Sequence, residues 1–125
     1  MIYGIGIDTE IIGRVERLLE EHADHIERVF TKDEQAAAAI LSPGQRLRFY
    51  ASAFSGKEAV MKALKTGWSP EVEWSEIEIP LGDSTTARLF GGSARVAHRM
   101  GISRIVVSIT GTSKIVVATA VAEKD

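Results

Sequence analysis

The chain has 125 residues, 45% of them hydrophobic and 26% charged, which fits one soluble globular domain spanning residues 1–125. The formal net charge of −2 provides no overall basic field, so we expect neither nucleic acid nor an anionic membrane as a partner. There is no cysteine, which excludes a disulfide framework, a thiolate zinc site and a thiol nucleophile. Because the sequence shows neither a signal-peptide pattern nor an apolar stretch of membrane-spanning length, we predict a cytoplasmic protein.

The first predicted element is a strand over residues 2–8, where, after its first residue, large apolar side chains alternate strictly with glycine or aspartate. Gly4, Gly6 and Asp8 share one face of this strand. Two positions without side chains therefore lead to one carboxylate, which lies where the strand is predicted to end. The glycines also have a plainer explanation, because a Gly-x-Gly pair permits close packing of the strand against a neighbour.

A helix is predicted after this strand, because apolar residues recur at helical spacing from Ile11 onward. Asp8 or Thr9 would cap its first turn, since short side chains with an oxygen accept hydrogen bonds from free backbone N–H groups. The apolar pattern weakens at residues 22–24, where we predict a break in the helix.

Two more helices are predicted from their first residues. Residues 31–34, Thr-Lys-Asp-Glu, have the spacing of a capping box. Ser42 followed by Pro43 is typical of a second helix start, and this helix should run to about Lys65 before Gly67 ends it.

The second half of the chain contains mainly short runs with β-type composition. We predict strands at residues 72–79 and 87–90, a short helix at 93–100, and a final hairpin formed by residues 104–110 and 114–122. The helices therefore gather in the first half and the strands in the second. This distribution indicates a single α+β domain.

The candidate chemical groups lie on the first strand and on the long helix. Ser55, Glu58 and Lys62 share one side of that helix, opposite its apolar stripe. The plain interpretation is that Asp8 caps a helix and that Glu58 and Lys62 form a solvent-exposed pair, and spacing alone favours it. If Asp8 and Glu58 meet, they offer two oxygen ligands to a magnesium ion, and Lys62 offers a positive charge to bound phosphates.

The chain resembles the holo-acyl-carrier-protein synthases, the short class of phosphopantetheinyl transferases. The resemblance rests on motifs whose order and spacing agree over nearly the whole chain: Gly4-Ile5-Gly6-Ile7-Asp8, Arg14-Val15-Glu16, Phe30-Thr31 with Glu34, Phe54 with Lys57-Glu58-Ala59, Lys62-Ala63, and Val107-Ser108-Ile109. It implies a phosphopantetheinyl transferase fold, in which helices pack on a small, mostly antiparallel sheet. It also implies a trimer with active sites between subunits, usually in fatty acid biosynthesis.

The implied reaction moves the 4′-phosphopantetheine arm of coenzyme A onto a serine of an apo acyl carrier protein and releases 3′,5′-ADP. By resemblance, Asp8 and Glu58 are the ligands of Mg²⁺ and act in catalysis together with Lys62. Substrate binding is assigned to Ser55, Lys57 and Lys62. The metal and the lysine would neutralise charge on the pyrophosphate while a carboxylate or a bound water takes the serine proton.

The carrier protein is expected to dock on the first helix. Arg14 matches a position that, in the family, contacts the acidic helix of the carrier protein, and Arg17 lies one turn further. An ordinary solvated helix would show the same two arginines. A docking role for them therefore stays an expectation.

Three positions depart from the family pattern, and all concern the coenzyme A side. Ala53 replaces an arginine that contacts a coenzyme A phosphate, Gly111 replaces a histidine, and Gly82-Asp83-Ser84-Thr85 replaces a Gly-Lys-Pro segment. Besides an active transferase, two alternatives stay open. One is a non-catalytic relative that binds coenzyme A or a carrier protein, and the other is an unrelated α+β interaction domain.

Overall fold

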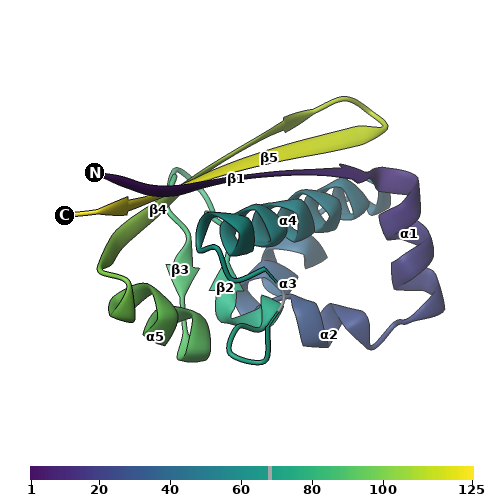
Figure 1. Ribbon diagram of the computed structural model, residues 1–125. Coiled ribbons are helices and arrows are strands. Elements are labelled where there is room, and N and C mark those ends of the chain that lie inside the picture. Colours follow the sequence, from purple (N-terminus) through teal and green to yellow (C-terminus); the bar gives the residue numbers. More distant parts are fainter. Residues whose placement is uncertain (68) are drawn as a thin grey trace.

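The computed structural model describes residues 1–67 and 69–125 (Figure 1). Its secondary structure follows the predicted order of helices and strands. The elements are β1 (Ile2–Ile11), α1 (Ile12–Glu21), α2 (His25–Val29), α3 (Lys32–Ala39), α4 (Pro43–Ala63), the 3-10 helix η1 (Trp74–Glu76), β2 (Ile77–Glu78), β3 (Arg88–Leu89), α5 (Gly91–Arg99), β4 (Ile102–Gly111) and β5 (Ile115–Lys124). The predicted α+β class is confirmed.

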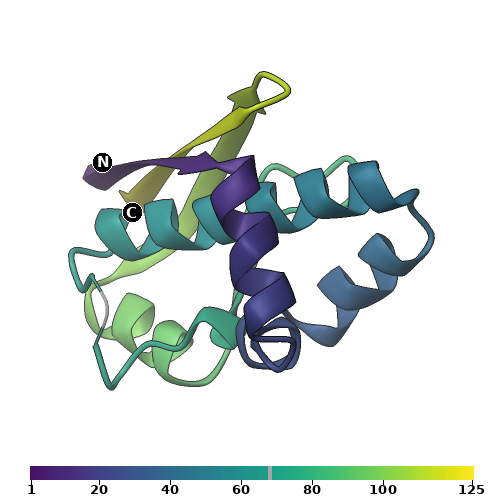
Figure 2. The same cartoon turned by 90° about the vertical axis from the view of Figure 1, so that its right-hand side faces the viewer.

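Three long strands form an antiparallel sheet in the order β1-β5-β4, and β2 and β3 form a separate two-stranded sheet. The predicted final hairpin is the β4–β5 pair, which extends beyond the body of the molecule in Figure 1. Helix α4 lies along one face of the three-stranded sheet, while α1 descends from the end of β1 (Figure 2). In the described part of the chain, no helix is long and apolar enough to cross a membrane.

Helix α4 packs directly on the backbone of β1. A Cβ atom at Gly4 would collide with the carbonyl of Ala63, and one at Gly6 would collide with the carbonyl of Ala59. The two glycines therefore do not clear a space for a ligand. They let the helix approach the strand closely, and this approach carries the residues of α4 up to Asp8.

The capping predictions for α3 and α4 are confirmed. Thr31 and Glu34 form a complete capping box, and Ser42 accepts a hydrogen bond from the backbone of Gln45 with Pro43 in the first turn. The prediction for α1 is wrong in detail, because β1 continues to Ile11 and no side chain caps the helix. Backbone pairing of β1 with β5 extends that far and outweighs the local capping signal.

The two strands before α5 are shorter than predicted, whereas those of the final hairpin are slightly longer. Within the described residues 69–90, Ile77–Glu78 and Arg88–Leu89 form the one two-stranded pair, and residues 74–76 form a 3-10 turn instead of a strand. The core lies between α4, the inner face of the large sheet, and the segment around β2. Its largest fully buried side chains include one ion pair, Lys57 with Glu34.

Candidate active site

Asp8 lies on the inner face of β1, opposite Ala118 of β5, and its carboxylate is held by two residues of α4. The Ser55 hydroxyl donates to Asp8 Oδ2 at 2.9 Å, and the Lys62 ammonium lies 3.2 Å from Oδ1. Lys62 also donates to the carbonyl of Ile7 at 2.8 Å. Asp8 is nearly buried, so it is an oriented carboxylate and not the helix cap of the plain interpretation.

Glu58 lies on α4 between Ser55 and Lys62, three residues after one and four before the other. These spacings place all three on one side of the helix. Both neighbours contact Asp8, and Asp8 and Glu58 both raise the pKa of Glu10, so Glu58 lies near the Asp8 carboxylate. Its own carboxylate accepts a hydrogen bond from Trp74 Nε1 at 3.0 Å, so Glu58 is not simply one half of a surface pair with Lys62.

Glu10 joins Asp8 and Glu58 in a cluster of carboxylates, and it was not among the site residues predicted from the sequence. It lies two residues beyond Asp8 and therefore on the same face of β1. Burial, the negative charge of Asp8, a hydrogen bond with Asp8 and the negative charge of Glu58 together raise the pKa of Glu10 to about 7, against an opposing effect of Lys62. The alternation of residues 4, 6, 8 and 10 would have placed Glu10 on this face if the predicted strand had continued past Asp8.

The pair of Asp8 and Glu58 suits a hard divalent cation. Its donors are carboxylate oxygens, the ligand type that magnesium takes in proteins. The negative charges of Asp8 and Glu58 repel an ionised Glu10 and so raise its pKa, and a bound cation would relieve this repulsion. In the described residues, no three or more His, Cys, Asp or Glu side chains are arranged to hold a metal alone. Asp8 and Glu58 would therefore leave the other coordination positions to water and substrate oxygens.

The expected contact between Lys57 and substrate does not fit the structure. The Lys57 ammonium is fully buried, lies 2.7 Å from Glu34 Oε1, and donates to the carbonyl of Trp74 at 3.0 Å. Burial lowers the pKa of Lys57. Ser55 is also fully buried beneath Asp8, so it orients that carboxylate instead of meeting the substrate. The helical spacing could not distinguish these buried positions from an exposed face, because α4 is covered on more than one side.

The remaining predicted residues lie away from the carboxylates. Arg14 and Arg17 are exposed on α1, on the surface where docking was expected. Ala53 is buried in the core, and Gly111 is the last residue of β4, packed against the backbone of Ile115. The segment at residues 82–85 lies in the connection between β2 and β3.

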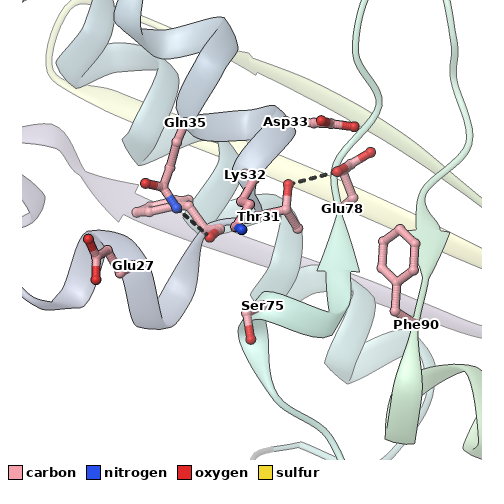
Figure 3. A pocket seen from close by; sticks show the side chains of 9 residues that line it. Glu27, Thr31, Lys32, Asp33, Gln35, Ser75, Glu78 and Phe90 are labelled. Carbon is pink, nitrogen blue, oxygen red and sulfur yellow. Dashed lines mark hydrogen bonds between the residues drawn. The ribbon is translucent and has the colours of Figure 1, made fainter.

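Two pockets lie near α2. Figure 3 shows a pocket between α2, α3 and the β2–β3 pair. Its volume is about 640 Å³, and within it Thr31 donates to Glu78 at 2.7 Å. None of the predicted site residues lines it. A second pocket of about 350 Å³ shares Trp74 with the carboxylate cluster. The residues that line it are Leu18, His25, Arg28, Val29, Phe54, Glu73, Trp74 and Ser75.

Comparisons with known proteins identify the family. The family model of the 4′-phosphopantetheinyl transferase superfamily matches residues 4–119. Two curated holo-acyl-carrier-protein synthases, from Solibacter usitatus and Alkaliphilus metalliredigens, are 34% and 37% identical to this chain, and each match covers 98% of this chain and 99% of the relative.

Two solved structures of synthases with the same name are also similar. The enzyme from Neisseria meningitidis matches at a TM-score of 0.86 with 29% identity over 99% of this chain and 100% of its own. The enzyme from Bacillus anthracis, solved in complex with CoA (3′,5′-ADP), matches at a TM-score of 0.80 with 30% identity over 100% of this chain and 99% of its own. These likenesses confirm the predicted fold.

Proposed function

Because this chain belongs to the holo-acyl-carrier-protein synthases of the 4′-phosphopantetheinyl transferase superfamily, we propose that it transfers 4′-phosphopantetheine from coenzyme A to a serine of an apo acyl carrier protein. The serine oxygen forms a bond to the phosphorus that carries the pantetheine arm, and the bond from that phosphorus to the leaving 3′,5′-ADP breaks. The observation that carries the proposal is the Asp8 carboxylate, held by Ser55 and Lys62 beside Glu58. The reaction would take place in the cytoplasm and serve fatty acid biosynthesis.

Asp8 and Glu58 would hold Mg²⁺. The ion, when bound, stabilises negative charge on the pyrophosphate of coenzyme A. Ser55 contributes by fixing Asp8, since its hydroxyl donates both to Oδ2 and to the Asp8 carbonyl at 3.1 Å. An oriented carboxylate loses little freedom when a cation binds, so the site is prepared before the substrates arrive.

Lys62 would supply the positive charge that meets the phosphates. Half of its side chain is exposed, so its ammonium can turn from Asp8 toward a ligand in the solvent. A lysine acts on phosphate as a point charge and needs no fixed fork geometry. A carboxylate of the cluster would accept the proton of the serine hydroxyl as the new bond to phosphorus forms.

The carrier protein would dock on α1 through Arg14 and Arg17. Both side chains are exposed, and α1 begins where β1 ends, three residues beyond Asp8. A basic surface at this position would attract an acidic helix and steer its serine toward the carboxylates.

We also propose a homotrimer formed through the outer face of the three-stranded sheet. Ile5 and Ile7 on β1 are 57% and 58% exposed, and Ile11 and Ile115 lie exposed on the same face. Several exposed large apolar side chains on one face of a sheet are typical of an interface between proteins. Self-association would cover these isoleucines and bring a second subunit close to the site.

The experiment that tests the reaction is mass spectrometry of an apo acyl carrier protein incubated with this chain, coenzyme A and Mg²⁺, with a chelator control. We expect a gain of one phosphopantetheine group that the chelator abolishes. The departures at Ala53 and Gly111 support a second candidate, a relative that binds coenzyme A or a carrier protein without transfer. Binding without any gain of mass, next to an active reference enzyme, would favour that candidate.

A further inference from the structure

The indole of Trp74 is the hydrogen-bond partner of Glu58. Trp74 begins the 3-10 helix η1, and its Nε1 donates to Glu58 Oε1 at 3.0 Å. Among the residues that the structure describes, no other side chain or backbone group donates a hydrogen bond to the Glu58 carboxylate. Asp8, in contrast, has both carboxylate oxygens engaged by residues of α4.

Trp74 is held at its backbone and at its ring. Its backbone carbonyl accepts a hydrogen bond from the buried Lys57 at 3.0 Å, and Lys57 is itself fixed by Glu34. Its ring packs against Phe54, with 6.1 Å between ring centroids and 36° between ring planes. The fixed backbone and the contact with Phe54 limit the two side-chain torsions that aim the indole N–H.

We propose that Trp74 is a positioning residue for Glu58, which its indole N–H orients for cation binding. The N–H engages Oε1 and leaves Oε2 for the ion, so that the carboxylate does not have to be ordered at the moment of binding. Donors behind a metal ligand commonly contribute in this way. The inference rests on the proposed function, since it concerns the same metal site, and it adds a residue outside the carboxylate cluster.

The first test measures the affinity for Mn²⁺, used alone as the probe, by electron paramagnetic resonance titration. Trp74→Phe keeps an aromatic ring against Phe54 while it removes the N–H donor and part of the ring volume. We expect its Kd for Mn²⁺ to rise about 10-fold. Phe54→Leu is the matched control, because it removes the ring contact and leaves the N–H in place, and we expect a smaller rise.

The outcomes of this titration separate the inference from the proposed function. A wild-type protein that binds no Mn²⁺ would contradict the metal site itself and the role of Trp74 with it. If the wild-type protein binds Mn²⁺ and the Trp74→Phe variant binds it equally well, only the positioning role is wrong. A thermal melt of each variant verifies that it is folded.

The second test follows the indole N–H by NMR and does not need a Trp74 variant. The chain has two tryptophans, so Trp68→Phe leaves one indole signal, which belongs to Trp74. We expect this signal to shift when Mg²⁺ is added and to stay unchanged when Glu58→Gln is introduced as well. A shift that persists in the double variant would show that the indole does not respond through Glu58, and the proposal would be wrong.

Discussion

The ammonium of Lys62 lies 3.2 Å from a carboxylate oxygen of Asp8, although 54 residues separate the two in the chain. Ser55 holds the other oxygen of the same carboxylate. Both partners lie on α4, and Glu58 lies between them on the same side of the helix. The contact of α4 with the glycines of β1 therefore assembles the whole cluster.

Removing either proposed metal ligand should abolish transfer. Asp8→Asn and Glu58→Gln keep the shape of each side chain and remove one negative charge. We expect the rate of carrier modification to fall about 100-fold or more, because charge stabilisation by a metal is worth several kcal/mol. The rate is measured by mass spectrometry under saturating Mg²⁺. A rate within threefold of wild type for both variants would contradict the assigned site.

The stability of the metal-free protein should depend on pH through Glu10. Its pKa is raised from 4.5 to about 7, so between these values the folded protein keeps a proton that the unfolded chain releases. This contribution to stability is present below pH 4.5 and is lost as the pH rises through 7. Glu10→Gln removes the ionisation. The free energy of unfolding of this variant, minus that of wild type, should therefore increase from pH 5 to pH 8.

The measurement for Glu10 is urea denaturation in the presence of chelator at both pH values. Glu16→Gln, which changes an exposed glutamate on α1, is the matched control and should show no such trend. Equal differences between Glu10→Gln and wild type at pH 5 and pH 8 would contradict the raised pKa.

The buried ion pair should be costly to break. Lys57→Met leaves Glu34 buried without its counter-charge, so we expect the free energy of unfolding to fall by about 3–5 kcal/mol. Glu34 would keep its hydrogen bonds from the backbone of Thr31 and Ile79, and replacing it as well, in Glu34→Gln with Lys57→Met, should restore part of the loss. Lys114→Met is the exposed control, expected within about 0.5 kcal/mol of wild type in urea denaturation. A loss below about 1 kcal/mol would show that the pair is not structural.

The outer face of the sheet should decide the oligomeric state. We expect the wild-type protein to sediment as a trimer and Ile7→Lys to sediment as a folded monomer, because a charged side chain at a covered position is expensive to bury. Ile40, which is 87% exposed at the end of α3, provides the control variant Ile40→Lys, and it should remain trimeric. A monomeric wild-type protein would rule out the proposed interface.

The local signals in the sequence predicted several elements correctly. Capping boxes and helix starts depend on residues three or four positions apart, so Thr31, Glu34, Ser42 and Pro43 marked their helices without knowledge of the fold. The resemblance carried by Asp8 and by the Lys-Glu-Ala motif likewise indicated the family before any coordinates were considered.

Other features depend on which surfaces meet, and a one-dimensional pattern does not contain that information. Pairing with β5 extends β1 to Ile11, and this extension brings Glu10 to the site. Burial on several sides of α4 turns Lys57 from an expected substrate contact into part of the core. The side chain that meets Glu58 is also decided in space, because Trp74 reaches it from a separate segment of the chain. The sequence by itself thus determined the starts of α3 and α4 and the family, whereas tertiary packing alone decided which charged groups are buried and which of them face the proposed cation.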